Sequence, residues 1–145
     1  MPWPYPADGA ETFLREDALP RVSKGDAHFW AICLTETPND LIGVIEFRLV
    51  TKVDDHRGFW LAEPYWGRGL MTEAVEAANR FAFEDLGVDS FLEENAANNT
   101  ASRRLKEKSG GQFLRYRECR YPSGECRSEV WRLTRDGWLA QRIRQ

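Results

Sequence analysis

The chain has few of the residues that build metal sites and disulfide frameworks. Its 145 residues include two histidines, His28 and His56, and neither has a partner at the spacing of a metal-ligand motif. The three cysteines, Cys33, Cys119 and Cys126, form no C-x-x-C pair, and an odd number does not suit a disulfide framework. We therefore expect no metal, and reduced thiols in a cytoplasmic protein.

Long apolar runs and an excess of positive charge are also missing. No apolar stretch approaches membrane-spanning length, and the proline-studded start at residues 1–6 is not a signal peptide. The formal net charge of -3 argues against a dedicated nucleic-acid binder, because such affinity comes mainly from neutralising phosphates. We expect partners other than membranes and nucleic acids, and a single domain over residues 1–145.

The stretch from Phe59 to Phe83 contains the most informative pattern. Phe59 to Ala62 is a continuous apolar run, which predicts a strand buried on both faces. Pro64 cannot donate to a ladder and should end that strand. Gly67 and Gly69 then bracket one arginine, and two glycines so close allow a tight turn and a near approach of the backbone to a ligand.

A helix is predicted to follow this turn. Its period starts at Leu70, and Gly87 is the expected C-terminal stop. The apolar face is predicted to consist of Leu70, Ala74, Ala77, Ala78 and Phe81.

A strand, a glycine turn and a helix start in succession predict an anion site. Free backbone N–H groups and the positive end of the helix dipole point outward together, which suits phosphate. A P-loop is excluded because Leu70 and Met71 follow the last glycine where Lys and Ser or Thr would stand. A dinucleotide fingerprint is excluded because Thr72 replaces its third glycine. Of the phosphate-binding sites considered, a pyrophosphate cradle of another type is the interpretation that remains.

The ten residues Tyr65 to Ala74, YWGRGLMTEA, resemble the acetyl-CoA pyrophosphate loop of the GNAT acetyltransferases, in the RimJ/RimL-like branch with its W-G-x-G-x-x-T-E-A signature. The resemblance implies an α/β acyl-CoA N-acyltransferase fold, with a central, mostly antiparallel sheet flanked by helices. A plain tight turn is the alternative interpretation, and ten consecutive matches make it the weaker one. The resemblance implies acetyl-CoA contacts at Leu61, Ala62, Trp66, Gly67, Arg68, Gly69, Leu70, Met71 and Thr72.

The rest of the chain predicts a mixed α/β order. A short helix capped by Asp8 is expected, then a polar connection, two strands joined by a turn, and a second turn into the central strand. A strand, a helix ended by two glycines, and a hairpin follow the central helix. The ranges are 8–19 (helix), 20–26 (connection), 28–35 and 41–50 (strands), 37–40 and 54–58 (turns), 90–95 (strand), 98–109 (helix), and 112–121 with 129–134 (hairpin).

The second helix carries a further resemblance. Asn99, Ser102, Leu105, Glu107, Lys108 and Gly110 match the family's N-x-x-S…L-x-E-K-x-G segment, which borders the cofactor arm. Asn99 can cap the helix and still offer its amide, and Arg104 is a candidate phosphate ligand. Arg103 and Lys108 are interpreted as a solvated basic face. Lys106 stands where many family members have a tyrosine that protonates the leaving thiolate. Ser102 could supply that acid, although a hydroxyl that bonds its own helix backbone is an equal alternative.

The implied reaction is direct attack of an amine on the thioester carbonyl. The oxyanion would be held by a backbone N–H near Leu61 or Ala62. A base must also take the ammonium proton. His56, whose type titrates near neutral pH, is one candidate, and Glu46 in the preceding strand is its rival. An exposed turn residue and a solvent-facing strand residue are the respective alternatives.

The resemblance also raises a question about assembly. Family members usually have a strand and a helix before the segment that corresponds to residues 2–19. The strand at 28–35 would then have an open edge, and we expect a second copy to cover it in a homodimer, by edge pairing or by exchange of residues 129–134. The acceptor is expected to be a protein N-terminus or a small amine.

Two other functions stay open at this point. A catalytically degenerate acyl-CoA-binding or interaction module would keep the cradle without turnover. RNA binding through the hairpin that contains Phe113, Arg115 and Tyr116 is disfavoured by the net acidity.

Overall fold

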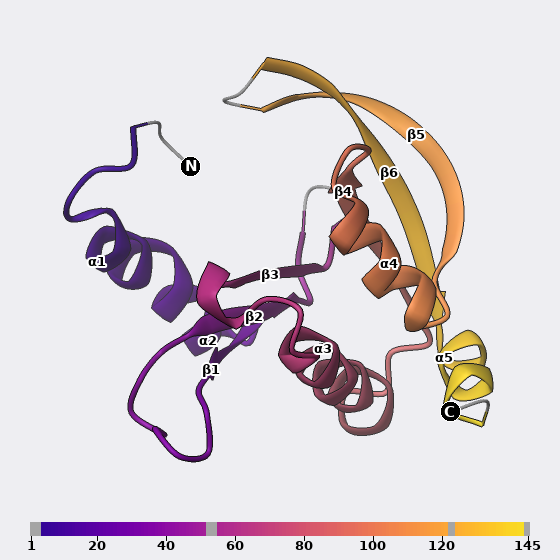
Figure 1. Ribbon diagram of the computed structural model, residues 1–145, viewed down its shortest axis with the longest axis horizontal. Coiled ribbons are helices and arrows are strands. Elements are labelled where there is room, and N and C mark those ends of the chain that lie inside the picture. The colour runs from indigo at the N-terminus through magenta and orange to yellow at the C-terminus, as the bar shows by residue number, and fades with distance from the viewer. Residues whose placement is uncertain (1–3, 52–54, 122–123, 144–145) are drawn as a thin grey trace.

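The computed structural model describes residues 4–51, 55–121 and 124–143, with side chains described outside 119–126 (Figure 1). The helices are α1 (Gly9–Phe13), α2 (Leu19–Lys24), α3 (Leu70–Arg80), α4 (Thr100–Lys108) and α5 (Arg135–Arg142), with π-helical turns at Leu14–Ala18 and Phe81–Asp85 and a 3-10 turn at Glu63–Tyr65. The strands are β1 (Ala27–Ile32), β2 (Gly43–Arg48), β3 (Arg57–Leu61), β4 (Ser90–Ala96), β5 (Gln112–Tyr121) and β6 (Gly124–Thr134).

The strands form two antiparallel sheets that meet at one point. The first has the order β1-β2-β3 and the second the order β4-β6-β5. His56, just before β3, donates its backbone N–H to the Leu92 carbonyl of β4 at 2.8 Å. Figure 1 shows the two sheets diverging from this junction, with α3 beside the first and α4 beside the second. The predicted mixed α/β class and the meander of the first three strands are confirmed.

The sequence predicts the helix start and stop signals around the central helix correctly. β3 ends before Pro64, and α3 begins at Leu70. Gly87 and Gly110 have φ of 69° and 89°, the left-handed conformation that glycine adopts at helix ends. The predicted strands 28–35 and 41–50 run past β1 and β2 by two or three residues, whereas β3 begins two residues before the predicted run 59–62. Residue 54 of the predicted turn at 54–58, and residues 122–123 between the predicted hairpin strands, lie outside the described residues.

The N-terminal helical segment is longer than predicted. It passes from α1 through a π-helical turn into α2 and ends at Gly25, so residues 20–24 are helical and do not form the expected polar connection. Pro20 does not stop the helix and lies where the π-helical turn Leu14–Ala18 passes into α2. Asp8 occupies the N-cap position of α1, but its side chain makes no capping hydrogen bond.

β3 is not buried on both faces, as its apolar run predicted. Phe59 and Leu61 are half-buried and Trp60 is 50% exposed. The reason is the layering: α3 and α4 cover one face, where Phe59 packs with Leu105 and Met71, and β3 forms the edge of its sheet.

α3 is rotated relative to the predicted apolar face. Its buried side chains are Val75, Ala78 and Asn79. Val75 and Ala78 pack in one cluster with Ile45 of β2 and Leu105 of α4, and Asn79 accepts a hydrogen bond from Arg57 of β3. The helix packs between β2 and α4, so its buried side is set by both neighbours. The other members of the predicted face line a pocket beside β1, namely Leu70, Ala74, Ala77 and Phe81.

Helix α5 was not predicted. Thr134 caps it by accepting a hydrogen bond from the Gly137 N–H at 3.0 Å. Trp138, which is 1% exposed, packs at 5.2 Å between ring centroids on Phe83. α5 thereby closes the main hydrophobic cluster, which contains Phe47, Ala82, Phe83, Phe91, Leu133 and Trp138.

Gly110 provides a test of this packing. A Cβ at residue 110 would overlap the Gly137 carbonyl of α5, and φ of 89° is strained for any other residue. Gly110→Ala should therefore lower the free energy of unfolding by about 2 kcal/mol or more, measured by urea denaturation. Gly87→Ala is the matched control, since its φ is 69° but no atom lies within 4 Å of the added Cβ. Equal losses for both variants would contradict the α4–α5 contact.

Candidate functional site

The glycine turn before α3 is open to an anion. Gly67 and Gly69 have φ of 71° and 81°, and no heavy atom lies within 4 Å of a Cβ built at either position. The first backbone hydrogen bond of the helix is donated by Glu73 to the Gly69 carbonyl, so the N–H groups of residues 70–72 have no intrahelical acceptor. The turn thus presents several donors and the positive end of an 11-residue helix.

The side chains around this turn are arranged on its surface. Trp66 is 63% exposed, and its indole N–H donates to the Leu61 carbonyl at 2.7 Å, which ties the turn to the end of β3. The Arg68 guanidinium lies 5.6 Å from the centre of the Tyr65 ring. Three of the predicted acetyl-CoA contacts, Trp66, Arg68 and Thr72, are exposed. The turn is therefore supported from β3 while its outer surface stays accessible.

The edge of β3 that faces β4 offers backbone donors. Ala62 donates its N–H to the Ile42 carbonyl at 2.8 Å, and His56 accepts from the Arg48 N–H at 2.7 Å. Alternate residues of an antiparallel strand bond to the same neighbour, so Phe59 and Leu61 direct their N–H groups away from β2. Of the two predicted oxyanion donors, Leu61 has this orientation, whereas the Ala62 N–H is already engaged.

Helix α4 brings the second predicted segment to the site. Asn99 caps the helix, with Oδ1 accepting from the Ser102 N–H at 3.0 Å. Arg104 is exposed. Arg103 is not part of a solvated face, as the sequence suggested: it forms an ion pair with the buried Glu129 of β6 and donates to the Ala97 carbonyl at 2.8 Å. Arg103 therefore anchors α4 on the second sheet.

The contact with Arg103 changes the pKa of Glu129. Burial alone would raise its pKa, but hydrogen bonds from Arg103 and Asn95 and the charge of Arg103 hold the pKa of this carboxyl below its usual range. The carboxylate is therefore charged at neutral pH.

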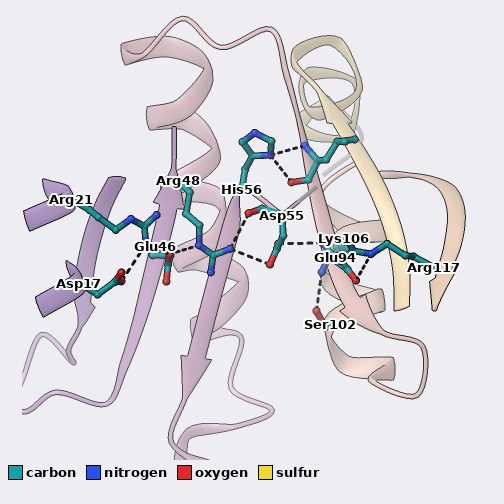
Figure 2. Close-up of polar contacts among 11 residues, drawn as sticks. Asp17, Arg21, Glu46, Arg48, Asp55, His56, Glu94, Ser102, Lys106 and Arg117 are labelled. Atoms are coloured by element: carbon teal, nitrogen blue, oxygen red, sulfur yellow. Dashed lines mark hydrogen bonds and ion pairs between the residues drawn. The ribbon is translucent and has the colours of Figure 1, made fainter. Parts of the chain in front are cut away.

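Lys106 is the residue that departs from the family pattern, and it is 1% exposed. Its Nζ donates to Ser102 Oγ at 2.9 Å (Figure 2). The same nitrogen lies 5.9 Å from the centre of the Phe59 ring. Burial lowers the pKa of Lys106, and Arg57 acts in the same direction, while the carboxylates of Glu93 and Asp55 oppose the shift.

The two candidate bases have different surroundings. The His56 ring lies at the junction of the sheets, with Nδ1 3.1 Å from the Leu92 carbonyl oxygen and 3.3 Å from its nitrogen. Glu46 is in an ion pair with Arg48 and lies 3.5 Å from Arg21. Figure 2 shows Arg48 reaching from Glu46 to Asp55. The Glu46 carboxylate is therefore engaged by two guanidinium groups.

Sequence reasoning missed the polar residues that lie beneath this region. Arg57 and Glu93 have fully buried side chains and form an ion pair, and Arg57 also donates to Asn79 of α3. Asp55 binds Arg48 and the Glu94 N–H, and burial raises its pKa although Arg48 acts against the rise. The alternation Phe91, Glu93, Asn95 was the available signal, but alternation alone does not show which face is buried.

A pocket of about 670 Å³ lies on the other side of the glycine turn. It is bounded by β1 and the residues after it, from Trp30 to Glu36, and by the outer face of α3, and it reaches the turn at Arg68. Within the described ranges, no group of three or more His, Cys, Asp or Glu residues could hold a metal ion. None of the helices in the described part of the chain has the length and apolarity to cross a bilayer.

Comparison with known proteins shows which family the chain resembles. A family model described as an acetyltransferase (GNAT) domain matches residues 1–112. A search of curated proteins gave no match.

Solved structures of acetyltransferases share the fold. One is RimL, a ribosomal L7/L12 alpha-N-protein acetyltransferase in complex with coenzyme A, with a TM-score of 0.77, 18% identity, and coverage of 94% of this chain and 79% of that one. Another is a putative ribosomal-protein-serine acetyltransferase from Vibrio cholerae, with a TM-score of 0.74, 20% identity, and coverage of 90% and 76%. A mutant of the spermidine N-acetyltransferase SpeG from Vibrio cholerae gives a TM-score of 0.76 at 14% identity, with coverage of 92% and 80%.

Proposed function

Because the chain belongs to the GNAT family of acetyltransferases, we propose that it transfers the acetyl group of acetyl-CoA to a primary amine. One observation carries the proposal. The open glycine turn follows β3 in the chain, and the outward N–H groups lie along the edge of β3 that β2 does not cover. Amine acetylation needs both parts: an anion cradle and an oxyanion donor.

The cradle holds the diphosphate of acetyl-CoA in this proposal. The N–H groups from Gly67 to Met71 and the dipole of α3 neutralise it, with Arg68 adding charge beside the turn. Asn99 and Arg104 approach from α4. The thioester extends along β3, where the Leu61 N–H points toward the carbonyl oxygen that becomes negative during attack.

His56 is the base that the geometry favours. Nδ1 lies between the Leu92 carbonyl and the Leu92 N–H, and the tautomer in which Nδ1–H donates to the carbonyl leaves Nε2 available to take a proton from the substrate's ammonium group before the amine attacks. Glu46 is less suited because Arg48 and Arg21 hold its carboxylate.

The acceptor is a peptide N-terminus or a small monoamine in this proposal. Two proteins of the same fold are RimL, a ribosomal L7/L12 alpha-N-protein acetyltransferase, and the spermidine N-acetyltransferase SpeG. The carboxylates that face the junction, Glu46, Asp55 and Glu94, are each paired with an arginine. Carboxylates neutralised in this way would attract a polyamine weakly, which favours an acceptor with one amine.

Gly69→Val tests the cradle. A branched side chain would occupy the open space where the diphosphate lies, and φ of 81° would be strained. Acetyl-CoA affinity, measured by calorimetry, should fall at least tenfold, whereas Gly87→Val carries the same type of backbone strain far from the turn and should bind normally. Unchanged affinity in Gly69→Val would remove the cradle from this account.

His56→Ala tests the base. The maximal rate of CoA thiol release with a panel of peptide and small amines should fall about a hundredfold, with acetyl-CoA affinity preserved. Glu46→Gln should retain more activity than His56→Ala. A His56→Ala enzyme with the wild-type rate at every pH would assign the base elsewhere. Wild-type protein that binds acetyl-CoA and releases no thiol with any amine would point to a degenerate acyl-CoA-binding module.

We also propose that the protein is a homodimer. Among the described strands, none pairs with the outer edge of β1, and the pocket beside it is lined by the apolar side chains of Trp30, Ile32 and Phe81. An open edge next to apolar side chains favours pairing with another chain. Residues 129–134 belong to β6, which pairs with β4 and β5 of its own chain, so their exchange would require both pairings to be broken and re-formed. Edge pairing of β1 is the form that fits.

Light scattering tests this assembly. A dimer is expected at micromolar concentration, and Ala31→Pro at the exposed position of β1 should shift it toward monomer because proline removes an edge donor. A stable wild-type monomer would reject edge pairing.

A further inference from the structure

Lys106 is a buried amine that the reaction as described so far does not use. An ammonium group has three donors, and Ser102 Oγ is the one hydrogen-bond acceptor that Nζ reaches among the described residues. Lys106 follows Ser102 by one helical turn, so both side chains lie on the same side of α4. That side faces Phe59, whose backbone N–H points to the open edge of β3.

The charged groups around Lys106 do not neutralise it by direct contact. Arg57 holds one carboxylate oxygen of Glu93, and the other has no hydrogen-bond partner among the described residues. Asp55 is bonded to Arg48 and to the Glu94 N–H, and Glu129 is bonded to Arg103. The Lys106 ammonium therefore has carboxylates near it but no ion pair with any described residue. Burial lowers its pKa, so it releases its proton more readily than a surface lysine would.

Ser102 is placed to pass that proton on. Its N–H is taken by the Asn99 cap, and its Oγ accepts from Lys106. A hydroxyl that accepts one hydrogen bond keeps its own O–H free to donate. No acceptor within the described ranges receives this O–H, so it can serve a group that enters beside Phe59.

We propose that Ser102 and Lys106 form a proton-donating pair that protonates the departing thiolate of coenzyme A. This step rests on the proposed acetyl transfer. The N–C bond forms and the C–S bond breaks, and the sulfur takes the hydroxyl proton of Ser102. Oγ takes a proton from Nζ in the same step. The neutral Lys106 then regains a proton from solvent, which balances the proton that the attacking amine gives up. Ser102 is the catalytic residue, and Lys106 acts through it.

The test compares variants that separate charge from proton donation. Lys106→Met removes both, whereas Lys106→Arg keeps the charge and a donor to Ser102 but does not release a proton. Lys108→Met, at an exposed position of the same helix, is the matched control. Each is assayed for CoA release with acetyl-CoA and the panel amine that the wild type uses fastest, and CoA affinity is measured by calorimetry.

Lys106→Met and Lys106→Arg should each lower kcat about a hundredfold, with CoA affinity within about twofold of the wild type. Ser102→Ala should lose a similar amount, and Ser102→Ala combined with Lys106→Met should lose little more, because the pair acts as one unit. The wild-type kcat should fall at alkaline pH as Lys106 loses its proton, and Lys106→Met should not show this fall. Lys108→Met should match the wild type.

A wild-type kcat in Lys106→Arg would reject proton donation by the pair. Lys106 would then contribute only its positive charge. Acetyl-Ser102 found by mass spectrometry of quenched enzyme would also overturn the pair, because the serine would then be a nucleophile. If Lys106→Met fails to fold, Ser102→Ala decides: an unchanged kcat and pH profile would reject the pair. Wild-type enzyme that releases no CoA with any amine would instead overturn the proposed function, and the pair with it.

Discussion

The meeting of the two sheets at His56 and Leu92 is the constraint on which the site depends. The backbone bond between them and the contact of the His56 ring with the same residue hold β3 and β4 together at one end. The Asp55 carboxylate repeats the link through the Glu94 N–H. Beyond this point neither strand pairs with the other, so the β3 edge keeps free donors. The same contacts thus fix the base candidate and create the edge along which a thioester can lie.

Buried charge is the second feature of the molecule, and it carries a cost. Arg57, Glu93 and Lys106 are removed from water in a small domain, where each ion loses several kcal/mol of hydration before pairing is counted. Arg57 and Glu93 offset part of this loss against each other. Among the described residues Lys106 forms no ion pair, so its fully buried position is explained better by chemistry than by stability.

Local signals in the sequence predicted the end of β3, the glycine turn and the start of α3 correctly. Pro64, the two glycines of the turn and the period that begins at Leu70 each act within a few residues, and the structure places all of them as expected. Asn99 as a helix cap belongs to the same class. These features depend on backbone conformation and hydrogen bonds that neighbouring residues determine.

Features that depend on distant contacts could not be predicted. The exposure of Trp60 follows from which layers cover β3, and the rotation of α3 follows from packing against both β2 and α4. Arg103 pairs with Glu129, which lies 26 positions further along the chain. Without that contact, the sequence indicated only a solvated basic face on α4. The engagement of Glu46 by Arg48 and Arg21 is likewise set by the register of β1, β2 and the N-terminal helices.

A crystal structure of the protein with coenzyme A is the most direct measurement of the central claim. The account predicts the diphosphate on the N–H groups of Gly67 to Met71, and the thiol between the Leu61 N–H and Ser102, where the sheets diverge. A coenzyme bound in the pocket between β1 and α3, or with its thiol away from β3, would contradict it.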